Sequence, residues 1–389
     1  MILVLAALLA CASPGRLLLF ETFPVQTSLD RPDMPEAHQV WVERIQAAEE
    51  GIDLMHFYAI DEPGGRLGPV VQALQQAAAR GVKVRFLADA GFTKTYPQLL
   101  EQLGAVPGIE VRLLDLKQVT GGVLHAKLMR IDDEVLVGSQ NFDWRSLEHI
   151  QELGAWVQDE SVAAATRQVF EADWARAGGE AAPPVSTTQT LPSTVRSPQG
   201  KVTVLPVFSP KELLPEPALW DLPYLLDWIA KAQTSVRLQV MSYETREYGG
   251  EEWFEFQDAL AEAAARGVRV EIIVAHWGLR RSRIGALREL ARLPGVDLRV
   301  ATIPEASQGF IPFARVIHSK FMVVDGARSW VGTSNIGSDY FYKSRNAGLL
   351  IEGEAVATSL DASFEGLWSS PYCETLDPDR DYPEPRIRE

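Results

Sequence analysis

Residues 123–154 read VLHAKLMRIDDEVLVGSQNFDWRSLEHIQELG, and this stretch decides how the rest of the chain is interpreted. Its residues of interest are, in order, His125, Lys127, Asp132, Gly138, Ser139 and Asn141. A second copy of the pattern consists of His318, Lys320, Asp325, Gly332, Thr333 and Asn335. One His-x-Lys has little meaning, because these residues are scattered over many surface strands. Two copies with matched downstream elements indicate a duplicated functional unit.

Other parts of the chain are duplicated as well. Ala77–Val84 is matched by Ala263–Val270, and Pro107–Arg112 is matched by Pro294–Arg299. A pattern that occurs twice indicates two copies of one unit and not a solenoid. We therefore expect five regions, which are a leader (1–15), a first repeat (16–176), a linker rich in Pro, Ser, Thr and Gly (177–200), a second repeat (201–376) and a tail (377–389).

Strand and helix patterns alternate in both copies. The first copy predicts a helix over 36–50, a strand over 52–60, a helix over 68–80 and a strand over 82–87. Such alternation is typical of right-handed crossovers between parallel strands. We expect an α/β fold of two pseudo-symmetric repeats, each a mostly parallel sheet flanked by helices, packed as one bilobed unit.

The composition is that of a globular protein with an acidic balance. Among 389 residues, 37 are basic and 52 acidic, which gives a net charge of -15. This charge argues against a general nucleic-acid coat, which needs a broad basic face, but not against an enzyme with a local basic site. Of the two cysteines, Cys11 lies in the leader and Cys373 near the end, so a disulfide framework is not indicated.

The first residues indicate a targeting signal. Residues 2–10, ILVLAALLA, form a short apolar run that is followed by Cys11. The run is too short to span a bilayer as a mature helix and is typical of a secretory signal. We expect export to the cell envelope or periplasm with membrane association through a lipidated Cys11. If the start of the chain is mis-assigned, the protein is expected in the cytoplasm.

The doubled pattern carries groups that suit phosphodiester chemistry. Residues two apart in a strand share a face, so His125 projects beside Lys127, and His318 projects beside Lys320. The polar groups expected to bind phosphate oxygens are Ser139, Asn141, Thr333 and Asn335. Two imidazoles and two ammonium groups around one point would neutralise a phosphate and handle bond making and proton transfer. Asp132 and Asp325 lie in turns and are expected to be structural.

A carboxylate beside one histidine would orient its ring. Glu152 is the candidate in the first copy, whereas the equivalent position in the second copy is Asn346, an uncharged amide. We expect His125, oriented by Glu152, to be the nucleophile and His318 to be the general acid. The reverse order of the two histidines stays open.

The doubled pattern resembles the His-x-Lys-x(4)-Asp signature of the phospholipase D superfamily. Within it, the chain looks most similar to the branch with animal endolysosomal 5′-exonucleases and poxvirus envelope phospholipase-like proteins. The segments that carry this closer likeness include Asp143–Leu147, Glu152–Gly154, Ala314–Val316, Tyr340–Phe341 and Ser370–Tyr372. The resemblance implies a covalent phosphohistidine, a reaction independent of metal and other cofactors, and a site where the two copies meet.

Three functions follow from this resemblance. The first is an exonuclease acting on single-stranded nucleic acid. The second is a phospholipase D or transphosphatidylase acting on membrane phospholipids, for which Gly309–Phe313 would be the apolar loop beside the site. The third is a catalytically silent binding scaffold, which the two intact His-Lys pairs disfavour. The sequence leaves open which of the two diester classes is the substrate, and whether the protein is a homodimer.

Overall fold

The structure is a computed structural model that describes residues 15–185, 189–246 and 250–388. The leader and Cys11 lie outside the described residues, so the expected signal and lipid anchor stay predictions. Among the helices that are described, none has the length and apolarity needed to cross a membrane. Within the same residues, sixteen strands form one continuous sheet, and two further short strands pair beside it.

The first half contains β1 (Gly15–Thr22), α1 (Ala37–Ala47), β2 (Gly51–His56), β3 (Ala59–Ile60), α2 (Leu67–Ala79), β4 (Lys83–Asp89), α3 (Ala90–Thr93), α4 (Gln98–Gly104), β5 (Ile109–Leu114), β6 (Lys127–Ile131), β7 (Glu134–Gly138), β8 (Phe142–Asp143), α5 (Trp144–Glu148), β9 (Glu152–Gln158) and α6 (Glu160–Ala177). The second half contains β10 (Ser193–Ser197), β11 (Gly200–Ser209), η1 (Lys211–Leu213), η2 (Pro217–Leu219), α7 (Asp221–Ala230), β12 (Ser235–Val240), α8 (Glu255–Ala265), β13 (Arg269–Ala275), η3 (His276–Leu279), α9 (Ile284–Ala291), β14 (Val296–Ala301), β15 (Phe321–Val324), β16 (Arg328–Gly332), α10 (Ser338–Tyr342), β17 (Asn346–Glu352), α11 (Glu354–Trp368) and β18 (Cys373–Thr375).

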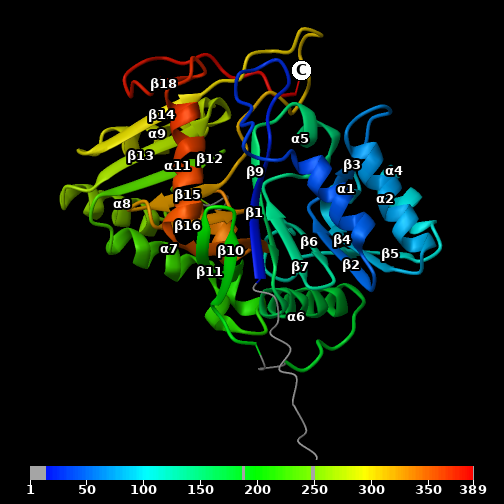
Figure 1. The fold of residues 1–389 in the computed structure, drawn as a ribbon. Helices are drawn as coiled ribbons and strands as arrows, with labels where there is room; N and C mark the ends of the chain where they lie inside the picture. Colours follow the sequence, from blue (N-terminus) through cyan, green and yellow to red (C-terminus); the bar gives the residue numbers. More distant parts are fainter. Residues whose placement is uncertain (1–14, 186–188, 247–249, 389) are drawn as a thin grey trace, which may run out of the picture.

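The strand order is mirrored about the centre of the sheet. Outward from the centre, the first half runs β1-β9-β7-β6-β2-β4-β5, and the second half runs β11-β17-β16-β15-β12-β13-β14. β10 lies between β1 and β11 and joins the two halves. Figure 1 shows the first half on the right and the second half on the left, with β1 and β9 at the centre. The α/β fold with two pseudo-symmetric repeats is therefore confirmed.

Two details of the sheet differ from the sequence-based expectation. The sheet is mixed and not mostly parallel, because β2 and β4 pair in parallel while β6 and β7 join as an antiparallel hairpin. The positive φ of Asp132, 49°, makes the tight turn of that hairpin. The second difference concerns the expected linker, since residues 193–197 of it form β10 in the central sheet.

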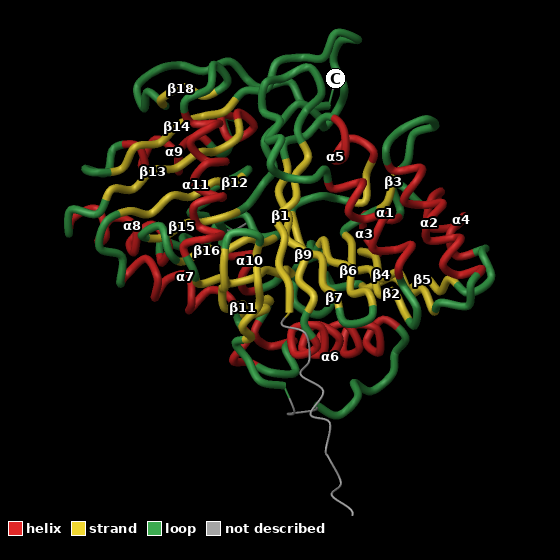
Figure 2. Tube along the Cα trace, in the orientation of Figure 1, coloured by secondary structure: helices red, strands yellow, loops and turns green. Residues whose placement is uncertain are grey.

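Alternating side chains of the buried strands pack against helices on both faces of the sheet. In β6, Met129 belongs to a core shared with residues of α1 and α2, whereas its neighbour Leu128 belongs to a core shared with α6. Figure 2 shows α1, α2 and α4 grouped beside the strands of the first half, and α6 alone across their lower end. Because helices cover both faces, whole strands such as β2 and β6 are buried, which is typical of this architecture.

A buried ion pair joins the two repeats. Arg345 of the second repeat and Asp173 of α6 are both fully buried, and their closest N–O distance is 2.5 Å. The guanidinium also donates to the backbone oxygens of Ser209 and Leu213, at 2.6 Å and 3.1 Å. Arg345 immediately precedes β17, so this pair fixes the start of that strand against the first repeat.

We predict that Asp173→Ala strongly destabilises the fold, because it leaves the Arg345 guanidinium buried without a counter-charge. Breaking such a pair by removing one partner costs about 3–5 kcal/mol. The free energy of unfolding in urea measures this effect. Asp227→Ala removes an exposed pair with Lys231 and should change that free energy by less than about 1 kcal/mol. Equal effects of the two variants would contradict the role assigned to the buried pair.

Candidate active site

The two His-Lys pairs lie at the junction of the repeats, where β6 and β15 begin. His125 directly precedes β6, and His318 lies three residues before the start of β15. The backbone N–H of His125 donates to the oxygen of Arg345, and that of His318 donates to the oxygen of Gln151, both at 2.8 Å. Each histidine is therefore anchored on the other repeat.

The side-chain partners of the histidines also cross between the repeats. His318 Nδ1 lies 2.9 Å from Glu152 Oε2, and His125 Nδ1 lies 3.0 Å from Asn346 Oδ1. The expectation that Glu152 orients His125 is therefore wrong. Glu152 begins β9 and Asn346 begins β17, so the mirrored strand order places each of them beside the histidine of the opposite repeat.

The surrounding hydrogen bonds fix which ring nitrogen carries the proton. Asn346 Nδ2 donates to the backbone oxygen of Tyr340, and Asn346 Oδ1 accepts from the Thr333 hydroxyl at 2.8 Å. The amide oxygen must therefore face His125, whose Nδ1 carries the hydrogen. Glu152 also accepts from Ser146 at 2.8 Å, which holds its carboxylate in place. In both rings Nε2 is left for chemistry.

Aromatic rings hold His125 from two sides. Its ring centroid lies 5.3 Å from that of Phe57 and 5.2 Å from that of Tyr340, and both contacts are edge-to-face. Phe57 directly follows β2, and Tyr340 belongs to α10. Neither contact was expected from the sequence, although Tyr340 lies in a segment that carries the family likeness, because an aromatic residue gives no signal of what it contacts across the fold.

The two lysines are buried beside the histidines. Lys127 Nζ donates to the backbone oxygen of His125 at 2.5 Å, and Lys320 Nζ donates to that of His318. Burial lowers the pKa of Lys320 to about 7, although the charge of Glu152 acts in the opposite direction. Burial and the charge of Lys320 also hold the pKa of Lys127 well below its ordinary value. These ammonium groups would be stabilised by a bound anion.

The two histidines differ in how readily they take a proton. Burial lowers the pKa of His318 to about 4, while the charge of Glu152 and its hydrogen bond oppose the fall. Burial and the charges of Lys127 and Lys320 hold the pKa of His125 well below its ordinary value. Burial would raise the pKa of Glu152, but His318 and Lys320 outweigh it, so the pKa lies below its ordinary value. The carboxylate of Glu152 therefore favours a proton on His318 more than the uncharged amide of Asn346 favours one on His125.

The residues expected to bind phosphate oxygens lie close behind the histidines. The Ser139 hydroxyl donates to Leu153 O and accepts from Leu153 N, and the Thr333 hydroxyl donates to Asn346. Both hydroxyls thus hold the start of β9 or β17, a role that the sequence did not indicate. Asn335 Nδ2 donates to the Tyr340 hydroxyl at 3.0 Å. The buried side-chain oxygen of Asn141 has no partner among the residues that the structure describes.

The two motif aspartates lie at the other end of their hairpins from the histidines. The Asp132 carboxylate accepts from the backbone N–H groups of Glu49, Glu50 and Gly51 at 2.8–3.0 Å. Asp325 likewise accepts from the backbone of residues 233–235 at 2.8–3.1 Å. Both contacts fasten the beginning of the adjacent strand, β2 or β12. In residues 15–185, 189–246 and 250–388, no group of three or more His, Cys, Asp or Glu is arranged to hold a metal.

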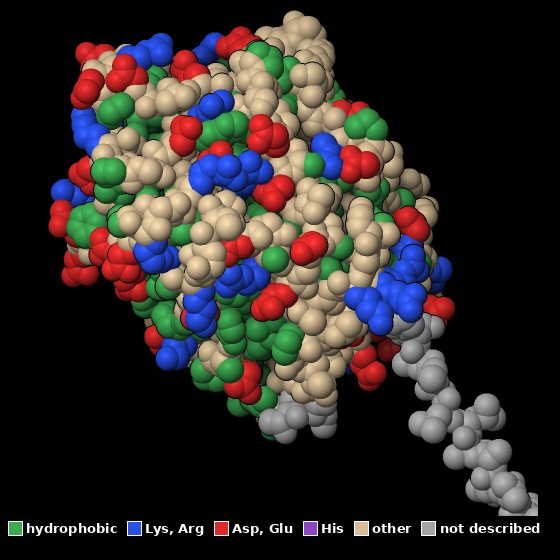
Figure 3. Space-filling model, turned by 60° about the vertical axis from the view of Figure 1, so that its left-hand side comes forward, with side chains coloured by type: hydrophobic (Ala, Val, Ile, Leu, Met, Phe, Trp, Pro, Cys, Tyr) green, Lys and Arg blue, Asp and Glu red, His purple; other side chains and the backbone are tan. Residues whose placement is uncertain are grey.

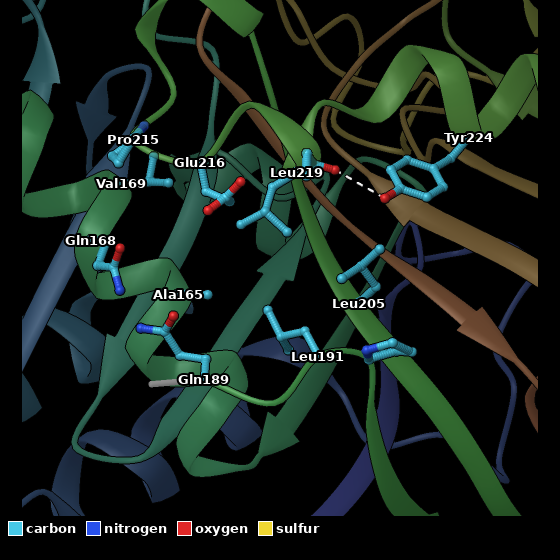
Figure 4. Close-up of a pocket in the computed structure, with 12 residues that line it drawn as sticks. Ala165, Gln168, Val169, Gln189, Leu191, Leu205, Pro215, Glu216, Leu219 and Tyr224 are labelled. Atoms are coloured by element: carbon cyan, nitrogen blue, oxygen red, sulfur yellow. Dashed lines mark hydrogen bonds between the residues drawn. The ribbon is translucent and has the colours of Figure 1, made fainter. Parts of the chain in front are cut away.

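A cavity of about 280 Å³ lies away from these groups. It opens between α6, residues 189–192 and the segment around η2, and its lining is mostly apolar. Figure 4 shows Leu191, Leu205 and Leu219 facing it, with Gln168, Gln189 and Glu216 at its margin. It contains none of the motif residues and offers no group for phosphodiester chemistry.

Comparisons with known proteins agree on the family. Residues 41–174 and 225–368 match the family model described as "Cardiolipin synthase, PLD-like domain", and each segment contains one His-Lys pair. The chain is 30% identical over 413 residues to the 5'-3' exonuclease PLD3 of Rattus norvegicus, covering 95% of this chain and 83% of that protein. It is 28% identical over 384 residues to Phospholipase D Z of Dictyostelium discoideum, covering 92% and 90%.

A solved structure has the same fold. The crystal structure of phosphatidylserine synthase of Haemophilus influenzae aligns with a TM-score of 0.63 at 14% sequence identity, covering 87% of this chain and 85% of that chain. At this level of identity the likeness concerns the fold alone.

We predict that Glu152→Gln lowers the pKa of His318 further, because an amide does not stabilise the imidazolium as a carboxylate does. The midpoint of the His318 ring titration, followed by NMR on histidine-labelled protein, measures the change. Glu148→Gln is the matched control, since Glu148 lies near His149 and not near His318. An unchanged His318 midpoint in Glu152→Gln would contradict the crossed pairing.

Proposed function

This chain belongs to the phospholipase D-like phosphodiesterase family and is a phosphoric diester hydrolase, and we propose that it is a metal-independent exonuclease acting on single-stranded nucleic acid. The observation that carries the proposal is the crossed pair of histidines at the repeat junction. Both rings keep Nε2 for chemistry while Nδ1 is held by the opposite repeat. Two lysines beside them supply positive charge for a phosphate.

The first step forms a covalent intermediate. His125 Nε2 attacks phosphorus, the bond from phosphorus to the leaving ester oxygen breaks, and that oxygen takes the proton from His318 Nε2. Of the two rings, His318 suits the role of general acid better, because the Glu152 carboxylate lies 2.9 Å from its Nδ1 and favours its protonated form. His125 suits the role of nucleophile because an uncharged amide faces its Nδ1, while the charges of Lys127 and Lys320 disfavour its protonated form. Glu152 is a positioning residue for His318 and also stabilises its charge.

The second step returns the enzyme to its first state. Water attacks the phosphohistidine, His318 Nε2 accepts the proton of that water, and the bond between phosphorus and His125 breaks. The products are an alcohol and a phosphate monoester. Throughout both steps the ammonium groups of Lys127 and Lys320 neutralise the equatorial oxygens, where their low-dielectric setting strengthens the attraction.

The substrate class rests on two supports. The relative named as a 5'-3' exonuclease matches over 95% of this chain, and the Phe57 ring that contacts His125 also contacts the exposed Phe92 ring, an aromatic surface of the kind on which single-stranded nucleic acid stacks. The overall charge of -15 requires that attraction to a polyanion be local. Figure 3 shows basic side chains interspersed with acidic ones over the face it presents, in keeping with a local site.

The lipid alternative rests on the relative named Phospholipase D Z and on the loop Gly309–Phe313. An apolar loop that enters a lipid surface should be uncovered. Here the Arg386 guanidinium lies 3.9 Å from the Phe310 ring centroid, and the Phe313 N–H donates to the backbone oxygen of Ile387 at 2.9 Å. The C-terminal tail therefore packs on this loop, which favours the nucleic-acid substrate.

We predict that the protein, with EDTA present, releases nucleotides stepwise from a 5′-hydroxyl single-stranded oligonucleotide. His125→Ala and His318→Ala should each lower kcat by at least about 10³-fold, because each removes a group that makes or breaks a bond. His38→Ala, a histidine outside the site, is the control and should retain activity. Far-UV circular dichroism checks that all variants are folded.

The same assay includes vesicles of phosphatidylglycerol and phosphatidylcholine. Release of a lipid head group without cleavage of the oligonucleotide would assign the protein to the phospholipase class. Substantial turnover of the oligonucleotide by either histidine variant would contradict the two-histidine mechanism.

A further inference from the structure

We propose that four aromatic residues beside His125 form a base-stacking subsite for the nucleotide adjoining the scissile phosphate. These residues are Phe57, Tyr58, Phe92 and Tyr96, and together they are called the aromatic strip. The inference rests on the proposed function, because it names how the same site holds a single-stranded substrate.

The strip extends from the nucleophile to the surface. The ring centroid of Phe57 lies 5.3 Å from that of His125 and 3.9 Å from that of Phe92. From Phe92 the rings continue to Tyr58 at 5.9 Å, and from Tyr58 to Tyr96 at 5.7 Å. A phosphate held by His125 would therefore have an aromatic surface within reach of its own nucleotide.

Two buried carboxylates hold the strip in a fixed place. Asp89 accepts from the N–H groups of Gly91 and Phe92, at 2.9 Å and 3.0 Å, and also from that of Leu124, at 2.9 Å. It thereby ties the backbone of Phe92 to the residue preceding His125. The hydroxyl of Tyr58 donates to Asp143 at 2.8 Å. A rigid aromatic surface loses little conformational entropy when a base stacks on it.

The outer end of the strip is open to solvent. Phe92 is 40% exposed and is the one aromatic among the large hydrophobic side chains that stand out as exposed in the described part of the chain. Such a ring keeps a face on which a base can stack. The partly buried Tyr58 stacks beside it with an interplanar angle of 23°.

Positive charge accompanies these rings. Lys127 Nζ lies 5.3 Å from the Phe57 ring centroid, at the inner end of the strip. The exposed Lys94 lies in the turn between Phe92 and Tyr96, at the outer end. Aromatic faces combined with positive charge are the arrangement that binds single strands without reading their sequence. An acyl chain would gain nothing from these charges, so the strip favours a base.

The test compares oligonucleotides that have or lack a base at one position. A 5′-hydroxyl oligothymidine with a fluorophore at its far 3′ end is compared with oligomers that carry an abasic tetrahydrofuran residue at the first or second position. The enzymes are wild type, Phe92→Ala, Phe92→Leu and the control Leu113→Ala. Leu113 is 43% exposed on β5, outside the strip, and so matches the exposure of Phe92.

We predict that Phe92→Ala lowers kcat/KM on the full oligothymidine by about tenfold, the order of one base stacked on an aromatic ring. Phe92→Leu should lose nearly as much, because leucine keeps apolar area but lacks an aromatic face. One abasic oligomer lacks the base that would occupy the strip. On that oligomer the kcat/KM values of wild type and Phe92→Ala should be equal within about twofold, since the stacking interaction is already absent. Leu113→Ala should match wild type on every substrate.

Equal losses by Phe92→Ala on full and abasic oligomers, or no loss on either, would overturn the inference. Wild-type cleavage of the oligothymidine reports on the proposed function separately. If wild type leaves every oligomer intact, the proposed function itself fails. If wild type cleaves but Phe92 and the base show no coupling, only the subsite fails.

Discussion

The structure depends on one pair of crossed hydrogen bonds, from each motif histidine to the first residue of the equivalent central strand in the opposite repeat. His318 binds Glu152, and His125 binds Asn346. The backbone N–H groups of the two histidines also donate to residues of the opposite repeat. The buried pair of Arg345 with Asp173 fixes the segment next to Asn346. Neither repeat alone could hold its histidine in a single orientation. The junction of the repeats is therefore what makes the chemistry available.

The same crossing makes the two halves of the site unequal. One histidine faces a carboxylate and the other an amide, so the duplicated motif gives one ring that accepts a proton more readily. Both rings and both lysines are buried, and burial disfavours every positive charge. Such a site is poised for an anion, since a bound phosphate offsets the cost of keeping these groups desolvated. An acidic chain can in this way hold a centre whose positive charge is favoured when an anion binds.

Much of the fold was predictable because its signals are local or repeated. The helix expected over 36–50 is α1, and the hairpin around Asp132 follows the expected turn, since hydrophobic periodicity and turn residues act over short distances. The parallel character of the sheet was overestimated, because periodicity does not reveal the direction in which strands pair. The expected linker also contains β10, which the sequence did not predict as a strand because its polar composition resembles that of a loop.

The candidate site was predictable in its residue types but not in its pairing. His125, Lys127, His318 and Lys320 meet as the duplicated spacing indicated. Glu152 was assigned to the wrong histidine, because the contact joins residues 166 positions apart and depends on the mirrored strand order. The ring contacts of Phe57 and Tyr340 depend on the same long-range packing. Spacing shows which groups recur, and only the fold shows which of them meet.

The most direct test of the central claim is a burst experiment with thymidine 3′-(p-nitrophenyl phosphate) and His318→Ala. This diester needs no acid for its leaving group, whereas hydrolysis of the intermediate needs His318 as base. We predict a burst of one p-nitrophenolate per protein and a nucleotide adduct on His125, located by mass spectrometry of peptides kept at neutral to alkaline pH. His125→Ala should give neither. A burst from His125→Ala with the adduct on His318 would contradict the assigned roles, and steady turnover by either variant would contradict the two-histidine site.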